Sequence, residues 1–166
     1  MASSGIELVI LGEDIAYQRH LYFSPALFTE VLLPYYQSLA RAIPPNRLVL
    51  GWHSDGDVSA ILPDLVDCGF RFFSLEAECV DLLAFKRTYG PRITLVGGLR
   101  TKWLHADMTD AHLAQECLSE IPSLLKEGGF ILSSSCGLHD LAFPPRLRRI
   151  YRLLDGAPDP SDEDQP

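Results

Sequence analysis

Five short apolar runs, each followed by a segment of helical character, limit the folds that this sequence can adopt. Each run has the length of a buried strand, and glycine, proline or acidic residues separate it from the next segment. The expected strands are 6–11, 48–52, 70–75, 92–96 and 130–133. The expected helices are 26–43, with a kink at Pro34, then 58–67, 80–89, 107–126 and 144–154. Because strands in successive βα units are parallel, the pattern predicts an α/β fold with a parallel sheet.

Two architectures fit the five expected strands, a doubly wound open sheet and part of a (β/α)8 barrel. A complete barrel needs eight strands and about 250 residues, whereas this chain has 166 residues. The chain is therefore expected not to close a barrel by itself. Open strand edges and an apolar inner face promote association. We expect a homo-oligomer, or a second chain that supplies the missing strands.

Composition and charge indicate a globular domain with an acidic tail. Apolar residues make up 47% of the chain and charged residues 22%, which is typical of a chain with a core. Much of the net charge of −8 comes from acidic residues near the C-terminal end. We expect a flexible N-terminus over 1–5, a folded domain over 6–155 and a disordered tail over 156–166. The body lacks the clustered basic surface that nucleic-acid binding needs.

Cysteine usage and the length of the apolar runs bear on location. The cysteines at positions 68, 79, 117 and 136 form no Cys-x-x-Cys pair, and no signal peptide opens the chain. We therefore expect free thiols and a cytoplasmic protein. No apolar run reaches the roughly 18 residues of a membrane span, so no membrane partner is expected.

The stretch His53-Ser54-Asp55-Gly56-Asp57 lies between the second expected strand and its helix. In α/β folds such a turn displays catalytic side chains, because the strand fixes their position. The alternative is structural, with the aspartates forming a turn and a helix N-cap and His53 a hydrogen-bonded strand end. Both interpretations stay open at this point.

Residues that follow different parallel strands meet at one rim, because all strand carboxyl ends lie on the same side of a barrel. Those expected at this rim are Glu13, Asp14, His53, Asp55, Asp57, Glu76, Arg100, Cys136 and His139. They bring imidazole, carboxylate, guanidinium and thiol groups to one region. The rim is therefore the expected place of the functional site.

A series of short motifs follows the predicted elements in a fixed order. They are Gly12-Glu13-Asp14-Ile15-Ala16, Ser24-Pro25-Ala26-Leu27-Phe28, Leu33-Pro34-Tyr35-Tyr36, His53-Ser54-Asp55-Gly56-Asp57, Leu62-Pro63-Asp64-Leu65, Gly97-Gly98 and Gly128-Gly129-Phe130-Ile131-Leu132. In this order and spacing, the chain resembles the C-terminal half of the uroporphyrinogen decarboxylase superfamily, which includes zinc- and corrinoid-dependent methyltransferases. The resemblance covers about 6–155 and implies a partial TIM barrel of about five parallel βα units that lacks the family's N-terminal strands.

The resemblance also implies a metal site. His53 and Cys136 match positions that carry zinc ligands in the similar methyltransferases, and Asp55 or Glu76 would complete a three-ligand set. Zinc would act as a Lewis acid on an ether or thiol group. Asp55 is a departure, because the zinc-bearing methyltransferases have a cysteine there. The alternative is that Cys136 is a small buried thiol and His53 only a hydrogen-bonding group.

The site prediction combines these observations. It assigns catalysis to Asp14, His53 and Asp55, substrate binding to Asp57, Arg100 and His139, and metal binding to His53, Glu76 and Cys136. Arg100 departs from many relatives, which have an acidic residue after the Gly-Gly pair.

Three functions agree with this prediction. The first is methyl transfer between a small methylated compound and a corrinoid protein, with zinc at the rim. The second is a decarboxylase-like protein of porphyrin biosynthesis that binds a tetrapyrrole without metal. The third is a non-catalytic half barrel that acts as an interaction module. In the true decarboxylases the absent half supplies an arginine-rich loop and a key aspartate, so this chain alone is expected to lack that activity.

Overall fold

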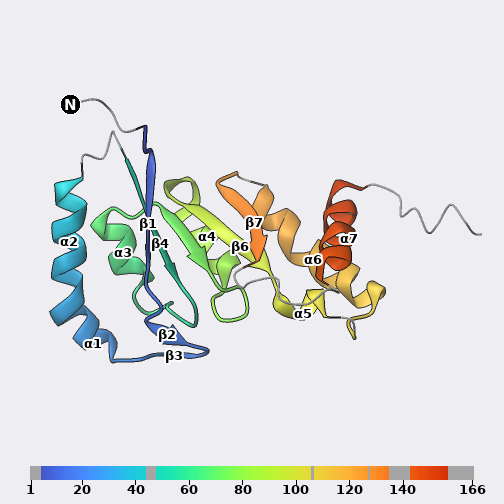
Figure 1. Cartoon of the computed structure of the whole chain (residues 1–166), viewed down its shortest axis with the longest axis horizontal. Coiled ribbons are helices and arrows are strands. Elements are labelled where there is room, and N and C mark those ends of the chain that lie inside the picture. Colours follow the sequence, from blue (N-terminus) through green and yellow to red (C-terminus); the bar gives the residue numbers. More distant parts are fainter. Residues whose placement is uncertain (1–4, 44–47, 106, 127, 135–142, 157–166) are drawn as a thin grey trace, which may run out of the picture.

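A five-stranded parallel sheet forms the centre of the molecule (Figure 1). The computed structural model describes residues 5–43, 48–105, 107–126, 128–134 and 143–156. The strands, in spatial order, are β1 (Leu8–Gly12), β4 (Val49–Ser54), β5 (Phe72–Leu75), β6 (Thr94–Leu99) and β7 (Phe130–Ser134). Spatial order follows chain order, as in a barrel, whereas a doubly wound sheet reverses at a switch point. The predicted α/β fold with a partial barrel is confirmed.

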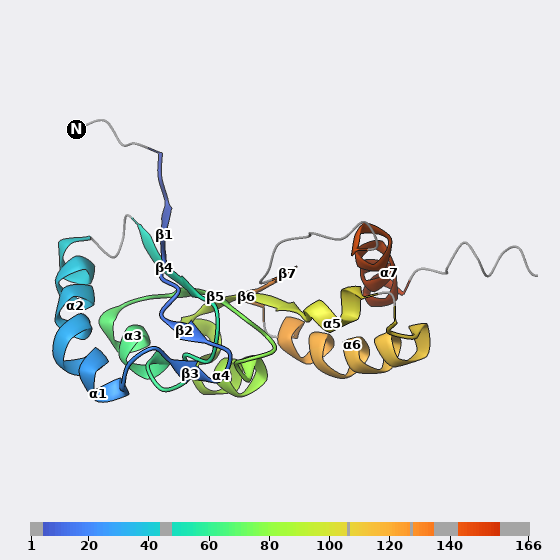
Figure 2. The ribbon, with the colours of Figure 1, turned by 60° about the horizontal axis from the view of Figure 1, so that its bottom comes forward.

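Helices cover one face of this sheet. Their bounds are α1 (Pro25–Leu27), a π-helical turn (Phe28–Leu32), α2 (Leu33–Ala42), α3 (Leu62–Cys68), α4 (Leu82–Tyr89), a 3-10 turn (Gly90–Arg92), α5 (Thr101–Leu104), α6 (Asp110–Leu125) and α7 (Phe143–Asp155). Figure 2 shows α2, α3, α4 and α6 on the same side of the strands. The right-handed crossovers of successive βα units explain this arrangement.

Prolines account for two features of these helices. Pro25 is the first residue of α1, and Ser24 caps this helix by accepting the Leu27 N–H. Further along, the chain forms a π-helical turn just before Pro34. The proline ring cannot donate a backbone hydrogen bond, and the wider turn accommodates this loss. Pro63 lies in the first turn of α3. A helix was expected over 58–67 but begins at Leu62, because proline fits the first turn better than the interior.

A small hairpin, absent from the predicted elements, follows β1. It pairs β2 (Ala16–Tyr17) with β3 (His20–Leu21) in antiparallel fashion (Figure 1). The Asp57 N–H donates to the Gln18 carbonyl at 2.7 Å, so the hairpin contacts the loop that follows β4. The hairpin therefore forms part of the sheet's carboxyl-terminal edge.

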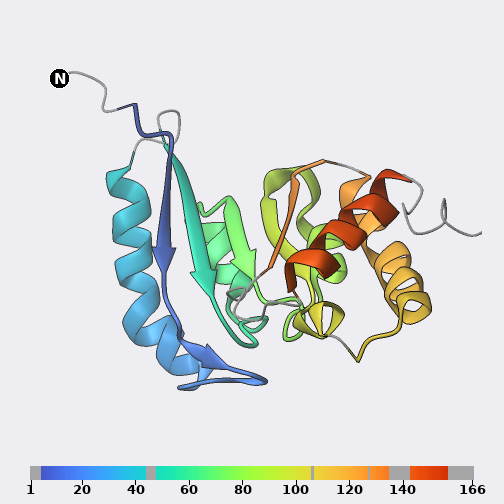
Figure 3. The ribbon, with the colours of Figure 1, turned by 45° about the vertical axis from the view of Figure 1, so that its right-hand side comes forward.

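The two faces of the sheet differ in burial, because successive strand residues point to opposite sides. The helix-facing side chains of Trp52, Phe73 and Leu95 are fully buried. On the opposite face, Ile10 and Ile131 are 45% and 49% exposed. Strand β1 is an edge of the sheet, as Figure 3 shows. The inner face of the partial barrel is therefore apolar and uncovered within the described residues.

Two of the arginines in α7 hold this helix against α6. Arg146 and Arg149 each pair with one carboxylate oxygen of Asp110, at 2.9 Å and 3.1 Å. Asp110 lies in the first turn of α6, where a negative charge also interacts favourably with the helix dipole. These two arginines thus contribute to helix packing.

Candidate functional site

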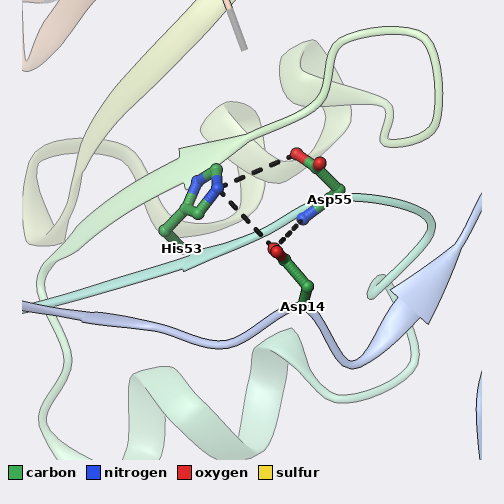
Figure 4. A group of neighbouring side chains, drawn as sticks. All are labelled: Asp14, His53 and Asp55. Carbon is green, nitrogen blue, oxygen red and sulfur yellow. Dashed lines mark hydrogen bonds and ion pairs between the residues drawn. The ribbon is translucent and has the colours of Figure 1, made fainter. Parts of the chain in front are cut away.

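The pairing of β1 with β4 brings the first two candidate loops together. Gly12 is the register partner of His53. Asp14 lies two positions after Gly12, and Asp55 lies two positions after His53. Asp14 and Asp55 therefore reach equivalent places beyond neighbouring parallel strands. Figure 4 shows both carboxylates directed toward the His53 imidazole.

Distances within this group are short enough for joint action. The Nε2 atom of His53 lies 3.9 Å from Asp14 Oδ1 and 3.8 Å from Asp55 Oδ1. The Asp55 backbone N–H donates to Asp14 Oδ1 at 3.4 Å. The His53 side chain is 30% exposed, so a ligand has access to the group. The three residues assigned to catalysis thus lie together, and their catalytic role stays a prediction.

The donor set fits a divalent metal ion. One potential ligand atom from each of the three residues lies within 4.8 Å of the others. Two ligands of a tetrahedral zinc ion lie about 3.3–3.6 Å apart, since each bond is about 2.0–2.2 Å. The His53–aspartate distances require only a small contraction to reach this value. Three protein ligands also leave one position for a substrate atom.

A residue that the sequence analysis missed orients His53. Its Nδ1 atom lies 3.1 Å from both the backbone oxygen and the hydroxyl of Ser74. With a proton on Nδ1, His53 donates to the carbonyl, and its Nε2 lone pair faces the two carboxylates. The signal in the sequence was a single polar residue inside the apolar run Phe72-Phe73-Ser74-Leu75.

Electrostatics at this site favour a cation. The pKa of Asp55 is raised above its ordinary value by burial and by the negative charges of Asp14 and Glu76, while His53 opposes the shift. Crowded carboxylates repel one another, and a bound cation relieves that repulsion.

Glu76 and Asp57 contribute to the loops in other ways. Glu76 Oε2 accepts the Gly56 N–H at 2.8 Å and the Cys79 thiol at 3.3 Å. Asp57 Oδ1 accepts the Ser59 N–H at 2.9 Å, as a turn residue does. Metal binding by Glu76 and substrate binding by Asp57 stay predictions.

Arg100 is engaged in a different ion pair. Its guanidinium donates to both carboxylate oxygens of Glu120, with a shortest distance of 2.8 Å, and to the Ala77 carbonyl at 2.8 Å. This network ties the end of β6 to α6. Substrate binding by Arg100 stays a prediction. Cys136 and His139 lie outside the described residues.

The fold is thus that of a partial (β/α)-barrel protein, with an imidazole and two carboxylates at the rim of the barrel. The family model for uroporphyrinogen decarboxylase (URO-D) matches residues 3–151. The chain therefore belongs to the uroporphyrinogen decarboxylase family, which confirms the resemblance seen in the sequence.

Similar proteins within the superfamily are methyltransferases. Methylcobamide:CoM methyltransferase MtaA of Methanosarcina barkeri is 29% identical over 159 residues, and the MtaA of its strain Fusaro is 23% identical over 159 residues. Each match covers 93% of this chain but 43% of the relative, so the chain spans less than half the length of these curated relatives.

A solved structure supports the fold. The methyltransferase from Methanosarcina mazei has a TM-score of 0.63 and 23% sequence identity, over 92% of this chain and 42% of that chain. Of the helices that the structure describes, none combines the length and apolarity that a membrane crossing requires. The cytoplasmic location and the three-part division of the chain stay predictions.

Proposed function

We propose that this chain is the metal-binding part of a methyltransferase that transfers a methyl group between a small methylated compound and a corrinoid protein. The observation that carries the proposal is the Asp14–His53–Asp55 group at the rim. The curated relatives support its chemistry, because they are named as methyltransferases that act between methylcobamide and CoM.

The chain's own residues would hold the metal in a defined orientation. Asp14 and Asp55 supply oxygen and His53 supplies nitrogen, a combination that zinc accepts. Ser74 fixes the imidazole so that Nε2 faces the metal position. A bound metal supplies Lewis acidity to the oxygen or sulfur of the substrate. From the resemblance alone, Cys136 is proposed as a ligand in place of one aspartate, so that three protein ligands still leave one position open.

One feature of the structure favours a second candidate function, a non-catalytic half barrel that acts as an interaction module. The inner face of the sheet exposes apolar side chains, including Leu8 and Ile10 of the edge strand β1. Such edges and patches mark association surfaces. The tetrapyrrole alternative has less support, because the Arg100 guanidinium is paired with Glu120.

Metal analysis of the purified protein distinguishes the methyltransferase from the interaction module. We expect stoichiometric zinc or cobalt after incubation and dialysis, lost in His53→Ala and kept in His112→Ala. His112 is an exposed histidine of α6 and controls for the loss of an imidazole. Wild-type protein that retains no metal would contradict the methyltransferase proposal and favour the interaction module.

A further inference from the structure

The loop that carries Asp55 is fixed by contacts on both sides of that residue. Before it, the Ser54 hydroxyl donates to the Asp55 carbonyl at 2.7 Å and accepts the Ile15 N–H at 3.3 Å. Ser54 is fully buried. This serine therefore joins the loop of Asp55 to the loop of Asp14.

After Asp55, the fixing group is the carboxylate of Glu76. Its Oε2 atom accepts the Gly56 N–H at 2.8 Å, so the bond holds the peptide that directly follows Asp55. A hydrogen bond from a backbone amide to a charged acceptor is stronger than one between neutral groups. Glu76 follows β5, so this contact ties the β4 loop to the next strand of the sheet.

Cys79 contacts the same carboxylate. Its thiol donates to Glu76 Oε2 at 3.3 Å. Burial, the hydrogen bond to Glu76 and nearby acidic charges raise the pKa of Cys79 to about 12. The thiol therefore stays protonated at neutral pH and acts as a donor that orients Glu76.

We infer that Glu76 is a positioning residue that acts through Gly56 to direct Asp55 toward His53, and that it is not a metal ligand. The inference rests on the proposed function, because it requires metal binding by the Asp14–His53–Asp55 group. It differs from the ligand role that the sequence suggested for Glu76. The Glu76 Oε2 atom accepts the bond from Gly56, which holds the Asp55 loop, and the bond from Cys79, which orients Glu76. Among the described residues, the group whose ligand atoms lie within 4.8 Å of one another is Asp14, His53 and Asp55, without Glu76.

Two substitutions at this position separate the roles. Glu76→Gln keeps a carbonyl oxygen that can accept the Gly56 N–H but replaces the anionic carboxylate, a group that zinc binds, with a neutral amide that is a poor zinc ligand. Glu76→Ala removes both the accepting oxygen and the carboxylate charge. We expect Glu76→Ala to weaken metal affinity about 10- to 100-fold, as for other outer-shell partners of metal ligands, and Glu76→Gln to weaken it far less.

The experiment measures cobalt(II) affinity by competition with a chromophoric chelator, together with the visible absorption of the bound ion. At saturation the absorption spectrum should match wild type in both Glu76 variants, because the coordinating atoms are unchanged. Glu78→Ala is the matched control. It removes a nearby carboxylate whose partner is the Thr101 N–H, and it should keep wild-type affinity.

Each outcome has a distinct meaning. Loss of affinity and an altered spectrum in Glu76→Gln would show that Glu76 is a ligand and overturn the inference. Wild-type affinity in Glu76→Ala would overturn it as well, while leaving the proposed metal site intact. No cobalt binding by the wild type would overturn the proposed function and this inference with it. If Glu76→Ala does not fold, Glu76→Gln alone decides between ligand and positioning residue.

Discussion

The substitution Gly56→Ala tests the backbone that presents Asp55. Gly56 has a φ of 76°, in the left-handed region that favours glycine. A Cβ atom there would lie 2.7 Å from the carbonyl carbon of Ala16 and 2.7 Å from the backbone nitrogen of Tyr17. The substitution therefore brings two separate costs, a strained backbone and a clash with the β2–β3 hairpin.

The two costs can be estimated separately. A non-glycine residue in the left-handed region loses about 1–2 kcal/mol. A methyl group forced into a packed region costs about 1–3 kcal/mol, and here the neighbours are backbone atoms that cannot rotate away. We expect Gly56→Ala to lower the free energy of unfolding by about 2–5 kcal/mol. In a chain of this length that corresponds to a fall in Tm of roughly 4–20 °C.

Two further glycines provide matched controls. Gly128 has a φ of 69° and nothing within 4 Å of an added Cβ, so Gly128→Ala should show only the backbone cost of about 1–2 kcal/mol. Gly12 ends β1 with open space around it and no positive φ. Gly12→Ala should leave stability unchanged or raise it by about 0.5–1 kcal/mol.

Urea unfolding followed by circular dichroism measures all three variants without metal. The difference between Gly56→Ala and Gly128→Ala isolates the contact with the hairpin. If the two variants lose equal stability, the close approach of Gly56 to Ala16 is wrong, and so is the described path of the Asp55 loop.

Four other predictions follow from the structure and the sequence. Because burial and neighbouring carboxylates raise the pKa of Asp55, the metal-free fold loses stability as pH rises from the ordinary aspartate pKa through the raised one. Asp55→Asn should therefore be more stable than wild type at neutral pH and equal to it in acid, by urea unfolding at each pH. Glu120→Ala leaves Arg100 without its bidentate partner and should cost about 1 kcal/mol, less in high salt, by the same assay. Ile10→Lys should reduce the self-association expected of the open β1 edge. Light scattering over a concentration series detects this association, and a wild type that stays monomeric at high concentration would contradict the expectation. Deleting 157–166 should leave Tm unchanged, because that segment is acidic and lacks large apolar groups, and a fall of several degrees would contradict its predicted independence.

The sequence by itself determined the α/β class and the parallel strands. Alternation of short apolar runs with helical segments is a local pattern, and it agrees with the folded structure because each apolar run must be buried. Position along the chain was also sufficient to place Asp14 and Asp55 after strands, whereas His53, expected after a strand, lies within β4. Local pattern was less reliable at element ends, since the strand expected over 92–96 extends over Thr94–Leu99.

Tertiary structure alone decided which of these residues meet and what holds them. The register of Gly12 with His53 sets Asp14 beside Asp55, and register depends on how the helices pack against the sheet. The hydrogen bond of Glu76 to Gly56 joins groups 20 positions apart in the chain. That of the Ile15 N–H to Ser54 spans 39 positions. Local periodicity carries no information on such pairs, because they form only when separate βα units pack side by side.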